Sequence, residues 1–281
     1  MNLAPGSDLI DYLVVGHITR DITPHGERLG GTAAYASLLA YRLGLQVGLV
    51  TAVSEDVSLS ALEGIDIYSL SSRHTTTFVN AYLSEGRKQE IRQIALPLKG
   101  SDIPELWQKA GIVHLAPVVH EIDPDLMVKF QRSFVGLSLQ GWLREWDERG
   151  RISPAPGNVP VSTCRQANAV VFSYEDVGQD PEVVRHYASL CPLLIATQGS
   201  QGSDLFFHGE KTHIPTTPRQ EVDPTGAGDI FAAAFFIHYQ QYGNEQEAAH
   251  FATSIAALSV TGKGLDGVPT RKELHTLQGV V

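Results

Sequence analysis

The sequence is poor in cysteine and contains no long apolar run. Its two cysteines, Cys164 and Cys191, are too few for a disulfide framework or a cysteine-based metal site, and we expect both to be reduced. No apolar run approaches the roughly 20 residues that a membrane-spanning helix needs. The start M-N-L-A-P-G-S-D lacks the basic and apolar regions of a secretory signal. We therefore expect a cytoplasmic protein without membrane contacts.

Clusters of basic residues are also missing. The 281 residues carry a formal net charge of −10, with lysine and arginine spread along the chain. This distribution argues against binding to nucleic acids or to anionic membranes. The eleven histidines show no metal-ligand spacing, and we expect His114, inside an apolar strand, to be a hydrogen-bonded core residue. An anionic ligand would have to be bound locally, by backbone amides, a metal ion and a few side chains.

What is present is typical of a globular α/β protein. Hydrophobic residues make up 43% of the chain, and strand-like apolar runs alternate with helical patterns along most of it. We expect strands at residues 9–15, 47–52, 112–115, 134–137, 169–172 and 193–196, and helices at residues 32–43, 181–190, 226–242 and 245–260. The alternation predicts a three-layer αβα sandwich with a mainly parallel sheet, built as a single domain over residues 1–281.

The most informative segment is V-D-P-T-G-A-G-D-I at residues 222–230, which runs into an apolar stretch. A glycine-rich turn that opens a helix presents unpaired N–H groups and a positive dipole end to an anion. Asp229 lies just inside this turn, where a negative group needs a role of its own, such as accepting a proton. With the amides of Gly226, Ala227 and Gly228 holding the charge on a phosphoryl group, the segment predicts phosphoryl transfer to an alcohol. The alternative is an ordinary helix start in which Asp229 only complements the dipole.

A second set of polar and glycine residues lies near the N-terminus. Asp21 follows the first predicted strand, at the edge where open α/β sheets bind ligands. Gly30 and Gly31 allow the backbone to approach a ligand closely, and the helix after them carries Tyr35. A solvated turn residue is the alternative for Asp21, and a Gly-Gly pair alone is weak evidence.

Two strands in the middle of the chain end in polar turns. T-Q-G-S-Q-G at residues 197–202 follows one of them and contains two glycines that permit close backbone contact. S-Y-E-D at residues 173–176 follows the other, and Glu175 or Asp176 offers the hard oxygen ligands that Mg²⁺ requires. The alternatives are a plain strand-to-strand turn and two acids that begin a helix.

In this order along the chain, these segments resemble the ribokinase-like (PfkB) carbohydrate kinases. D-P-T-G-A-G-D-I-F-A-A-A-F is similar to the C-terminal signature of that family. The resemblance implies a ribokinase-like fold with a small β lid, Asp229 as the base, and an anion hole at residues 226–228. It implies that the acceptor is bound by Asp21, Gly30, Gly31, Tyr35 and Asp229, and the nucleotide by Ser173, Thr197, Gly199, Gly202, Gly226 and Gly228.

The resemblance also implies cofactors and partners. ATP and Mg²⁺ are expected, with Glu175 or Asp176 near the metal, and K⁺ is a candidate monovalent cation at Asp223 and Thr225. The expected partners are a small sugar or polyol and ATP, bound by a monomer or homodimer. Similar kinases carry an arginine where this chain has Arg144, which could reach a phosphate; we expect Trp142 and Trp146 around it to be a packing cluster.

Two positions depart from the family pattern. Tyr35 stands where many of these sugar kinases carry an asparagine, and Ser173 replaces another asparagine. The first change argues against ribose or fructose and resembles the inositol-kinase branch, for which myo-inositol is the acceptor. Two other functions stay open. One is a nucleoside or hydroxymethylpyrimidine kinase, in which Tyr35 stacks on a ring, and the other is a non-catalytic sugar or nucleotide sensor.

The lid is predicted from two segments, approximately residues 19–29 and 75–94. The second is rich in β-formers over residues 75–83, can turn at residues 84–87 and returns over residues 88–94. Only residues 22–29 separate Asp21 from the Gly-Gly pair, which is too few for a full additional hairpin. We therefore expect a reduced lid.

Overall fold

The computed structural model describes residues 9–24, 26–83 and 86–278. Its strands are β1 (Tyr12–Val15), β2 (Thr19–Thr23), β3 (Gly26–Gly30), β4 (Val47–Val53), β5 (Asp66–Ser71), β6 (Thr76–Leu83), β7 (Gly86–Gln93), β8 (Ile112–Leu115), β9 (Phe134–Ser138), β10 (Arg144–Trp146), β11 (Ile152–Pro154), β12 (Ala169–Ser173), β13 (Leu193–Thr197), β14 (Ser203–Phe207) and β15 (Glu210–Ile214). Its helices are α1 (Thr32–Arg42), α2 (Val161–Gln166), α3 (Pro181–Leu190), α4 (Ala227–Tyr242), α5 (Glu245–Ser259) and α6 (Arg271–Gln278).

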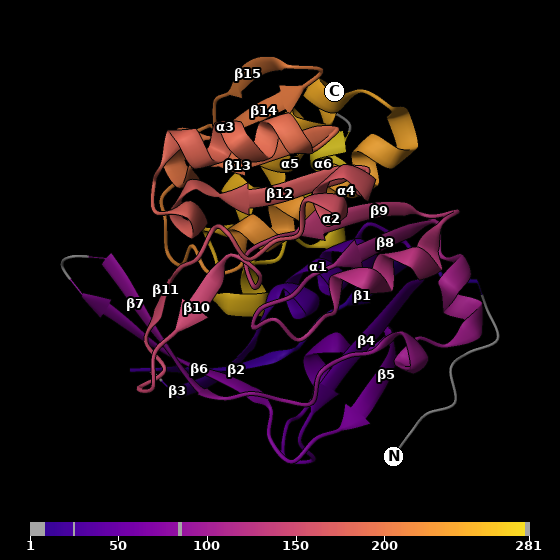
Figure 1. Cartoon of the computed structure of the whole chain (residues 1–281), viewed down its shortest axis with the longest axis vertical. Coiled ribbons are helices and arrows are strands. Elements are labelled where there is room, and N and C mark those ends of the chain that lie inside the picture. The colour runs from indigo at the N-terminus through magenta and orange to yellow at the C-terminus, as the bar shows by residue number, and fades with distance from the viewer. Residues whose placement is uncertain (1–8, 25, 84–85, 279–281) are drawn as a thin grey trace.

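A nine-stranded sheet forms the centre of the molecule, in the order β15-β14-β13-β12-β9-β8-β1-β4-β5 (Figure 1). All pairs from β13 to β5 are parallel, whereas β14 and β15 are antiparallel to their neighbours. Every residue of β1, β4 and β8 is buried, which explains why these strands are mostly apolar along their whole length and do not alternate. The predicted mainly parallel sheet is confirmed. The edge strands β5 and β15 were not predicted, because they are only partly buried and less apolar.

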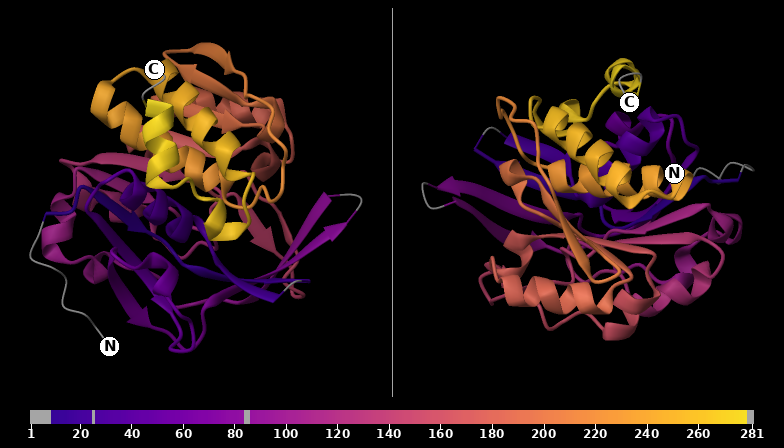
Figure 2. Two further views of the ribbon diagram at one scale, coloured as in Figure 1. Left: turned by 180° about the vertical axis from the view of Figure 1, so that it is seen from behind. Right: turned by 90° about the horizontal axis from the view of Figure 1, so that it is seen from above.

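Helices cover both faces of this sheet. α1, α4, α5 and α6 pack on one face, and α2, α3 and several 3₁₀ turns pack on the other (Figure 2). α4 is buried continuously over residues 230–237. It packs against α5, α1 and the sheet, so its sequence is apolar on all sides rather than along one stripe. The predicted three-layer sandwich is therefore confirmed.

A separate four-stranded sheet, in the order β3-β2-β6-β7, forms the lid. The expectation that residues 22–29 are too few for a hairpin is wrong, because the hairpin includes the two landmarks themselves. β2 begins at Thr19, before Asp21, and β3 ends at Gly30, so Thr19 pairs with Gly30. Part of the turn predicted at residues 84–87 lies outside the described residues, as do the first eight residues, to which the secretory-signal argument applied.

The register of the lid places one row of side chains on a common face. Arg28, Asp21, Phe78 and Ile91 are successive cross-strand partners from β3 to β7. Because side chains alternate between the two faces of a strand, residues 23 and 80 share this face. On the far side of β7, the amide of Ile91 donates to the carbonyl of Gly150 (2.8 Å) in the β10–β11 ribbon, which covers part of the lid's outer edge.

None of the helices in the described part of the chain combines the length and the apolar character that crossing a bilayer requires.

Candidate active site

The predicted site residues gather at the carboxyl edge of the parallel strands. The chain passes from the end of β1 into β2, which carries Asp21, and Ser173 and Thr197 are the last residues of β12 and β13. α4 begins at Ala227, directly after the glycine turn. Ligands of open α/β sheets bind at this edge, so the topology brings together segments that lie far apart in the sequence.

A cavity of about 510 Å³ lies between the lid and the segment that precedes α4. Its lining residues are Asp21, Thr23, Pro24, Arg28, Leu29, Tyr35, Asn80, Glu221, Val222, Asp223, Pro224, Thr225, Lys263 and Gly264. Four of these were predicted for the site: Asp21, Tyr35, Asp223 and Thr225. Sequence analysis missed Thr23, Arg28 and Asn80 as site residues. A hairpin that begins at Thr19 would have placed them on the same face as Asp21, so its register is the signal that could have found them.

Asp21 is held by close contacts within the lid hairpin. The hydroxyl of Thr19 donates to its Oδ1 (3.0 Å), and only 7% of the residue is exposed. A Cβ at Gly30 would lie 2.7 Å from Oδ2 of Asp21, and a Cβ at Gly31, where φ is +86°, would lie 2.6 Å from the carbonyl oxygen of His17. The Gly-Gly pair therefore allows the end of β3 to close onto Asp21.

Asp229 lies in the first turn of α4 and is half-buried. The hydroxyl of Thr32, the first residue of α1, donates to its Oδ1 (2.7 Å). Its neighbour Gly228 is exposed, and a Cβ there would meet nothing within 4 Å. The carboxylate is therefore oriented by α1 and is not sealed inside the protein.

The glycine turn supplies two of the three predicted amide donors. The amide of Ala227 donates to the carbonyl of Pro224 (3.2 Å), and α4 makes its first backbone bond from Ile230 to Gly226 (2.9 Å). Within the described residues, the amides of Gly226 and Gly228 donate to no acceptor in the chain. These two N–H groups at the positive end of α4 are suited to bind an anion.

The ring of Tyr35 packs against this turn. Tyr35 is 2% exposed, and a Cβ at Gly226, where φ is +83°, would lie 2.4 Å from its Cδ1. The residue also lines the cavity. Because the ring is covered by the turn, Tyr35 shapes the anion-binding segment and does not offer an open face for stacking.

Asp223 forms an ion pair with the lid. Nη1 of Arg28 lies 3.0 Å from its Oδ2, the amide of Gly264 donates to the same oxygen (3.2 Å), and the amide of Thr225 donates to Oδ1 (3.0 Å). Burial alone would raise the pKa of Asp223, but the hydrogen bonds from Thr225 and Gly264 and the charge of Arg28 outweigh it and lower the pKa. Asp223 is therefore ionised, and both of its carboxylate oxygens accept hydrogen bonds.

The predicted nucleotide residues Ser173 and Thr197 lie at the ends of two paired strands. Ser173 and Thr197 are partners in the β12–β13 register, and the hydroxyl of Ser173 donates to the carbonyl of Thr197 (3.4 Å). Gly199 has φ of +55° and open space at its Cβ position, as a backbone that faces a ligand would. At Gly202 a Cβ would lie 2.1 Å from the carbonyl oxygen of Ile214, so this glycine is required by packing against β15.

Glu175 and Asp176 follow Ser173 in a short 3₁₀ turn. Asp176 accepts a hydrogen bond from the amide of Ser173 (2.8 Å), which is the helix-starting role considered for it. Glu175 is exposed at the same edge. Groups of three or more potential metal-binding side chains are absent from the described residues. The pair nevertheless fits Mg²⁺, which in kinases is usually held by one or two carboxylates together with waters and substrate phosphates.

A buried carboxylate holds the 3₁₀ turn that begins at Tyr174. Asp204 of β14 accepts hydrogen bonds from the hydroxyl of Tyr174 (2.8 Å), from Lys211 (2.8 Å) and from His213 (2.9 Å). Burial alone would raise the pKa of Asp204, but these donors outweigh it and lower the pKa. Since Tyr174 directly follows Ser173, the cluster fixes the start of the 3₁₀ turn.

Several other conspicuous residues are structural. His114 lies between the hydroxyls of Tyr12 (2.8 Å) and Ser138 (2.7 Å), and burial lowers its pKa to about 3, which confirms the prediction of a core residue. Trp142 packs in the core, and Trp146 packs against the small cluster under the lid. Arg144 is 8% exposed and lies against the ring of Phe78, so it belongs to the lid side and not to the nucleotide side.

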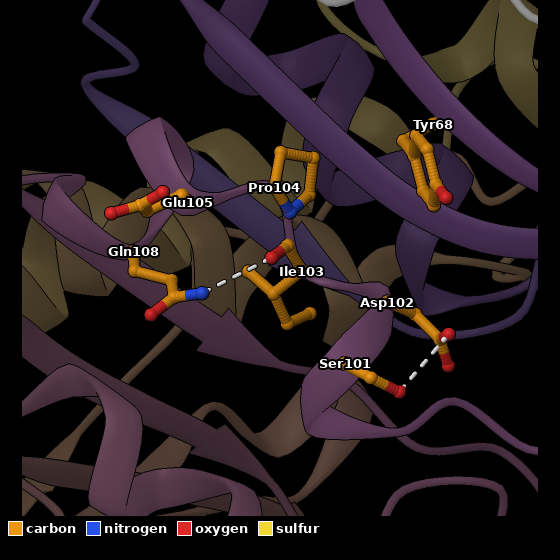
Figure 3. A pocket seen from close by; sticks show the side chains of 7 residues that line it. All are labelled: Tyr68, Ser101, Asp102, Ile103, Pro104, Glu105 and Gln108. Carbon is orange, nitrogen blue, oxygen red and sulfur yellow. Dashed lines mark hydrogen bonds between the residues drawn. The ribbon is translucent and has the colours of Figure 1, made fainter.

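A second depression, of about 540 Å³, lies away from these residues (Figure 3). It is lined by Tyr68 of β5 and by Ser101, Asp102, Ile103, Pro104, Glu105 and Gln108. Gln108 donates to the carbonyl of Ile103 (3.1 Å), and Ser101 contacts Asp102 (3.5 Å). None of the predicted site residues lines it.

Comparisons with known proteins show similarity to kinases. Residues 169–271 match the model of the pfkB family carbohydrate kinases. The chain is 26% identical over 259 residues to the cytidine kinase of Thermococcus kodakarensis, a match that covers 83% of this chain and 90% of the relative. It is 27% identical over 292 residues to the inositol 3-kinase of Zea mays, covering 94% of this chain and 75% of the relative.

A solved structure shows the same fold. A pyrophosphate-dependent kinase in the ribokinase family, complexed with a pyrophosphate analogue and myo-inositol, superimposes with a TM-score of 0.78 at 20% sequence identity. The match covers 94% of this chain and 99% of that one. The ribokinase-like fold predicted from the sequence is confirmed.

Proposed function

We propose that this chain is a ribokinase-like kinase, since residues 169–271 match the pfkB family of carbohydrate kinases, and that it transfers a phosphoryl group from ATP to a hydroxyl of a small sugar or polyol. Asp229 is the general base, and the amides of Gly226 and Gly228 bind the transferred group. Asp21 holds the acceptor in the cavity beneath the lid. A cyclic polyol such as myo-inositol is the acceptor that we favour.

One observation carries this proposal. The carboxylate of Asp229 is oriented by the hydroxyl of Thr32 (2.7 Å) beside an open glycine turn whose amides at Gly226 and Gly228 have no acceptor in the described chain. A helix start that served only the fold would not need a carboxylate oriented by the first residue of another helix. Proton abstraction and binding of negative charge are the two functions that phosphoryl transfer requires.

In the proposed reaction, Asp229 accepts the proton of the acceptor hydroxyl as its oxygen attacks the terminal phosphorus of ATP. The bond between that phosphorus and the bridging oxygen breaks, and ADP leaves with the electron pair. Glu175 and Asp176 are the residues that would hold Mg²⁺ or its waters, and the metal would supply positive charge next to the phosphates. Ser173, Thr197 and Gly199 line the approach of the nucleotide phosphates.

The choice of a polyol follows from the side chains around the cavity. Asp21 accepts hydrogen bonds, Asn80 can donate and accept, and Thr23 adds a hydroxyl. Such a set suits a ligand with several adjacent hydroxyls, and similarity to the inositol 3-kinase supports it. A nucleoside is the second candidate, supported by similarity to the cytidine kinase. The covered ring of Tyr35 weighs against the stacking that such an acceptor would favour.

The test is a panel of inositols, pentoses, hexoses and nucleosides, each assayed for phosphorylated product with ATP or with pyrophosphate as donor. Pyrophosphate is included because a kinase of the same fold depends on it. We expect a polyol to be phosphorylated, and Asp229→Asn to reduce kcat by roughly 10²- to 10⁴-fold, the usual contribution of a general base.

Asp125→Asn provides the matched control, because Asp125 is exposed and lies outside the site. It should leave kcat unchanged. Full turnover in Asp229→Asn would refute the assignment of the base. Absence of product with every acceptor and both donors would favour a non-catalytic sensor instead.

A further inference from the structure

The carboxylate predicted to bind a monovalent cation already has three donors around it. Oδ2 of Asp223 accepts from the guanidinium of Arg28 (3.0 Å) and from the amide of Gly264 (3.2 Å), and Oδ1 accepts from the amide of Thr225 (3.0 Å). The side chain of Asp223 is 11% exposed and that of Arg28 is 33% exposed. The ion pair is therefore partly shielded from water.

These donors do not fit a bound K⁺. A monovalent cation requires oxygen lone pairs that point at it, whereas N–H groups already donate to both oxygens of this carboxylate. The guanidinium cannot be deprotonated in a protein and keeps its charge at every physiological pH. A second cation beside Asp223 would be repelled by Arg28 and would have to displace its hydrogen bond.

We propose that the guanidinium of Arg28 takes the place of a monovalent cation at the segment that carries Asp223 and Thr225, so that the protein needs no K⁺. The charge that would organise this segment comes from the lid strand β3 and not from solution. The inference rests on the proposed function, because the segment leads directly into the glycine turn and Asp229.

The position of Arg28 explains how it would act. Arg28 is the cross-strand partner of Asp21 in the β2–β3 hairpin. It therefore links the strand that carries Asp21 to the segment that leads into α4. Its partner Asp223 is also tied by its amide to the carbonyl of Val260 (3.1 Å), at the end of α5. Arg28 is thus a positioning residue that fixes the start of the anion-binding turn relative to the lid.

The first experiment uses the wild-type protein and does not require turnover. Its melting temperature is measured in chloride salts of K⁺, Na⁺ and choline at an equal ionic strength of about 0.1 M, at which general screening is the same in all three. We expect the same melting temperature in each salt. With an acceptor in hand, kcat should also be the same in each. A melting temperature or kcat that rises specifically with K⁺ would overturn the inference.

The second experiment removes the guanidinium. In Arg28→Ala, Asp223 keeps its charge but loses its partner, and we expect kcat to fall roughly tenfold or more, as when one member of a partly buried pair is deleted. K⁺, but not choline, should restore part of this loss and raise the melting temperature, because the freed carboxylate can then bind a cation. Arg28→Lys keeps a cation in place and should stay indifferent to K⁺.

Arg20→Ala is the matched control. Arg20 lies on the same hairpin, and it pairs with Asp56, whose side chain is 64% exposed. Its removal should produce no K⁺ response in melting temperature or kcat. An Arg28→Ala protein that folds but remains indifferent to K⁺ would contradict the inference, and the wild-type salt series decides the matter if that variant fails to fold. A protein that phosphorylates no acceptor would defeat the proposed function while leaving the melting results valid.

Discussion

The hydroxyl of Thr32 donates a hydrogen bond of 2.7 Å to Oδ1 of Asp229, across 197 positions of sequence. Thr32 begins α1 and Asp229 lies in the first turn of α4, so the bond joins the starts of two helices. Thr32 also follows Gly31 directly, and the Gly-Gly pair closes onto Asp21. The bond therefore links the carboxylate proposed to hold the acceptor, through the Gly-Gly pair and α1, to the carboxylate proposed as the base.

Replacing Thr32 by valine should lower kcat while leaving KM for the acceptor nearly unchanged. Valine keeps the shape of threonine but removes the donor that orients Asp229. Hydrogen bonds to charged groups contribute about 1.5–3 kcal/mol, and if that energy is lost in the transition state, kcat falls roughly 10- to 100-fold. Steady-state kinetics at saturating ATP would measure both parameters.

Thr32→Ser is the control for this substitution, because serine keeps the hydroxyl and should retain most of the turnover. In the Asp229→Asn background, Thr32→Val should cost little more, since residues that act as a unit are not additive. An equally large further loss in that background would show that Thr32 acts independently of Asp229.

Gly226→Ala should destabilise the fold more than Gly209→Ala does. The two glycines have nearly the same left-handed backbone, with φ of +83° and +82°. Only Gly226 has the ring of Tyr35 against it, 2.4 Å from the position of a Cβ, whereas nothing lies within 4 Å at Gly209. We expect about 1–2 kcal/mol for the conformation alone at Gly209. At Gly226 we expect an additional 1–3 kcal/mol, approximately, for the clash.

Chemical denaturation would give both free energies of unfolding. Adding Tyr35→Leu to Gly226→Ala should recover part of the loss, because the smaller side chain leaves room for a methyl group. Equal losses at the two glycines would mean that Tyr35 does not press on the turn in solution.

The layered sheet could be predicted because its buried strands and helices show strong hydrophobic patterns in the sequence. β1, β4 and β8 are buried on both faces and read as apolar runs, and the glycines at the start and end of α4 define its bounds. β5 and β15 leave a weaker pattern, since each is an edge strand with partly exposed residues. Hydrophobicity alone cannot separate such strands from loops.

The sequence could group several predicted site residues, but it could not give their contacts. Asp21, Tyr35 and Asp223 do line one cavity, but the partners of Asp223 and Asp229 lie 195 and 197 positions away. A local motif carries no information about such distant side chains. The ion pair of Arg28 with Asp223 depended on the register of a hairpin whose existence sequence analysis had rejected.

The free energy of unfolding should fall in acid because of His114. Burial lowers the pKa of His114 to about 3, whereas an unfolded histidine titrates near 6.5. Below pH of about 6.5 the unfolded chain gains a proton that the native state excludes, so stability is complete above that pH and falls toward pH of about 3. This group contributes a slope of up to about 1.4 kcal/mol per pH unit.

Denaturation at a series of pH values would show this contribution as a difference between proteins. His114→Gln keeps polar contacts for Tyr12 and Ser138 but cannot titrate, so its stability should depend less steeply on pH between roughly 4 and 6. His250→Gln, at an exposed position, should keep the wild-type slope. An unchanged slope in His114→Gln would mean that His114 is protonated in the native state.

Tyr174→Phe should weaken binding of the phosphoryl donor without affecting the acceptor. The hydroxyl of Tyr174 donates to Asp204 (2.8 Å), whose side chain is 4% exposed, and this bond fixes the turn that carries Glu175 and Asp176. Since Lys211 and His213 still contact Asp204, we expect a loss of only about 1 kcal/mol in stability, the net value of one hydrogen bond. KM for the donor should rise several-fold while KM for the acceptor stays constant, because the cluster supports Glu175 and Asp176, which we propose to act at the nucleotide phosphates. Tyr242→Phe, at a residue that is 60% exposed, should change neither KM. If the acceptor KM rose together with the donor KM in Tyr174→Phe, the two sides of the site could not be as separate as the structure indicates.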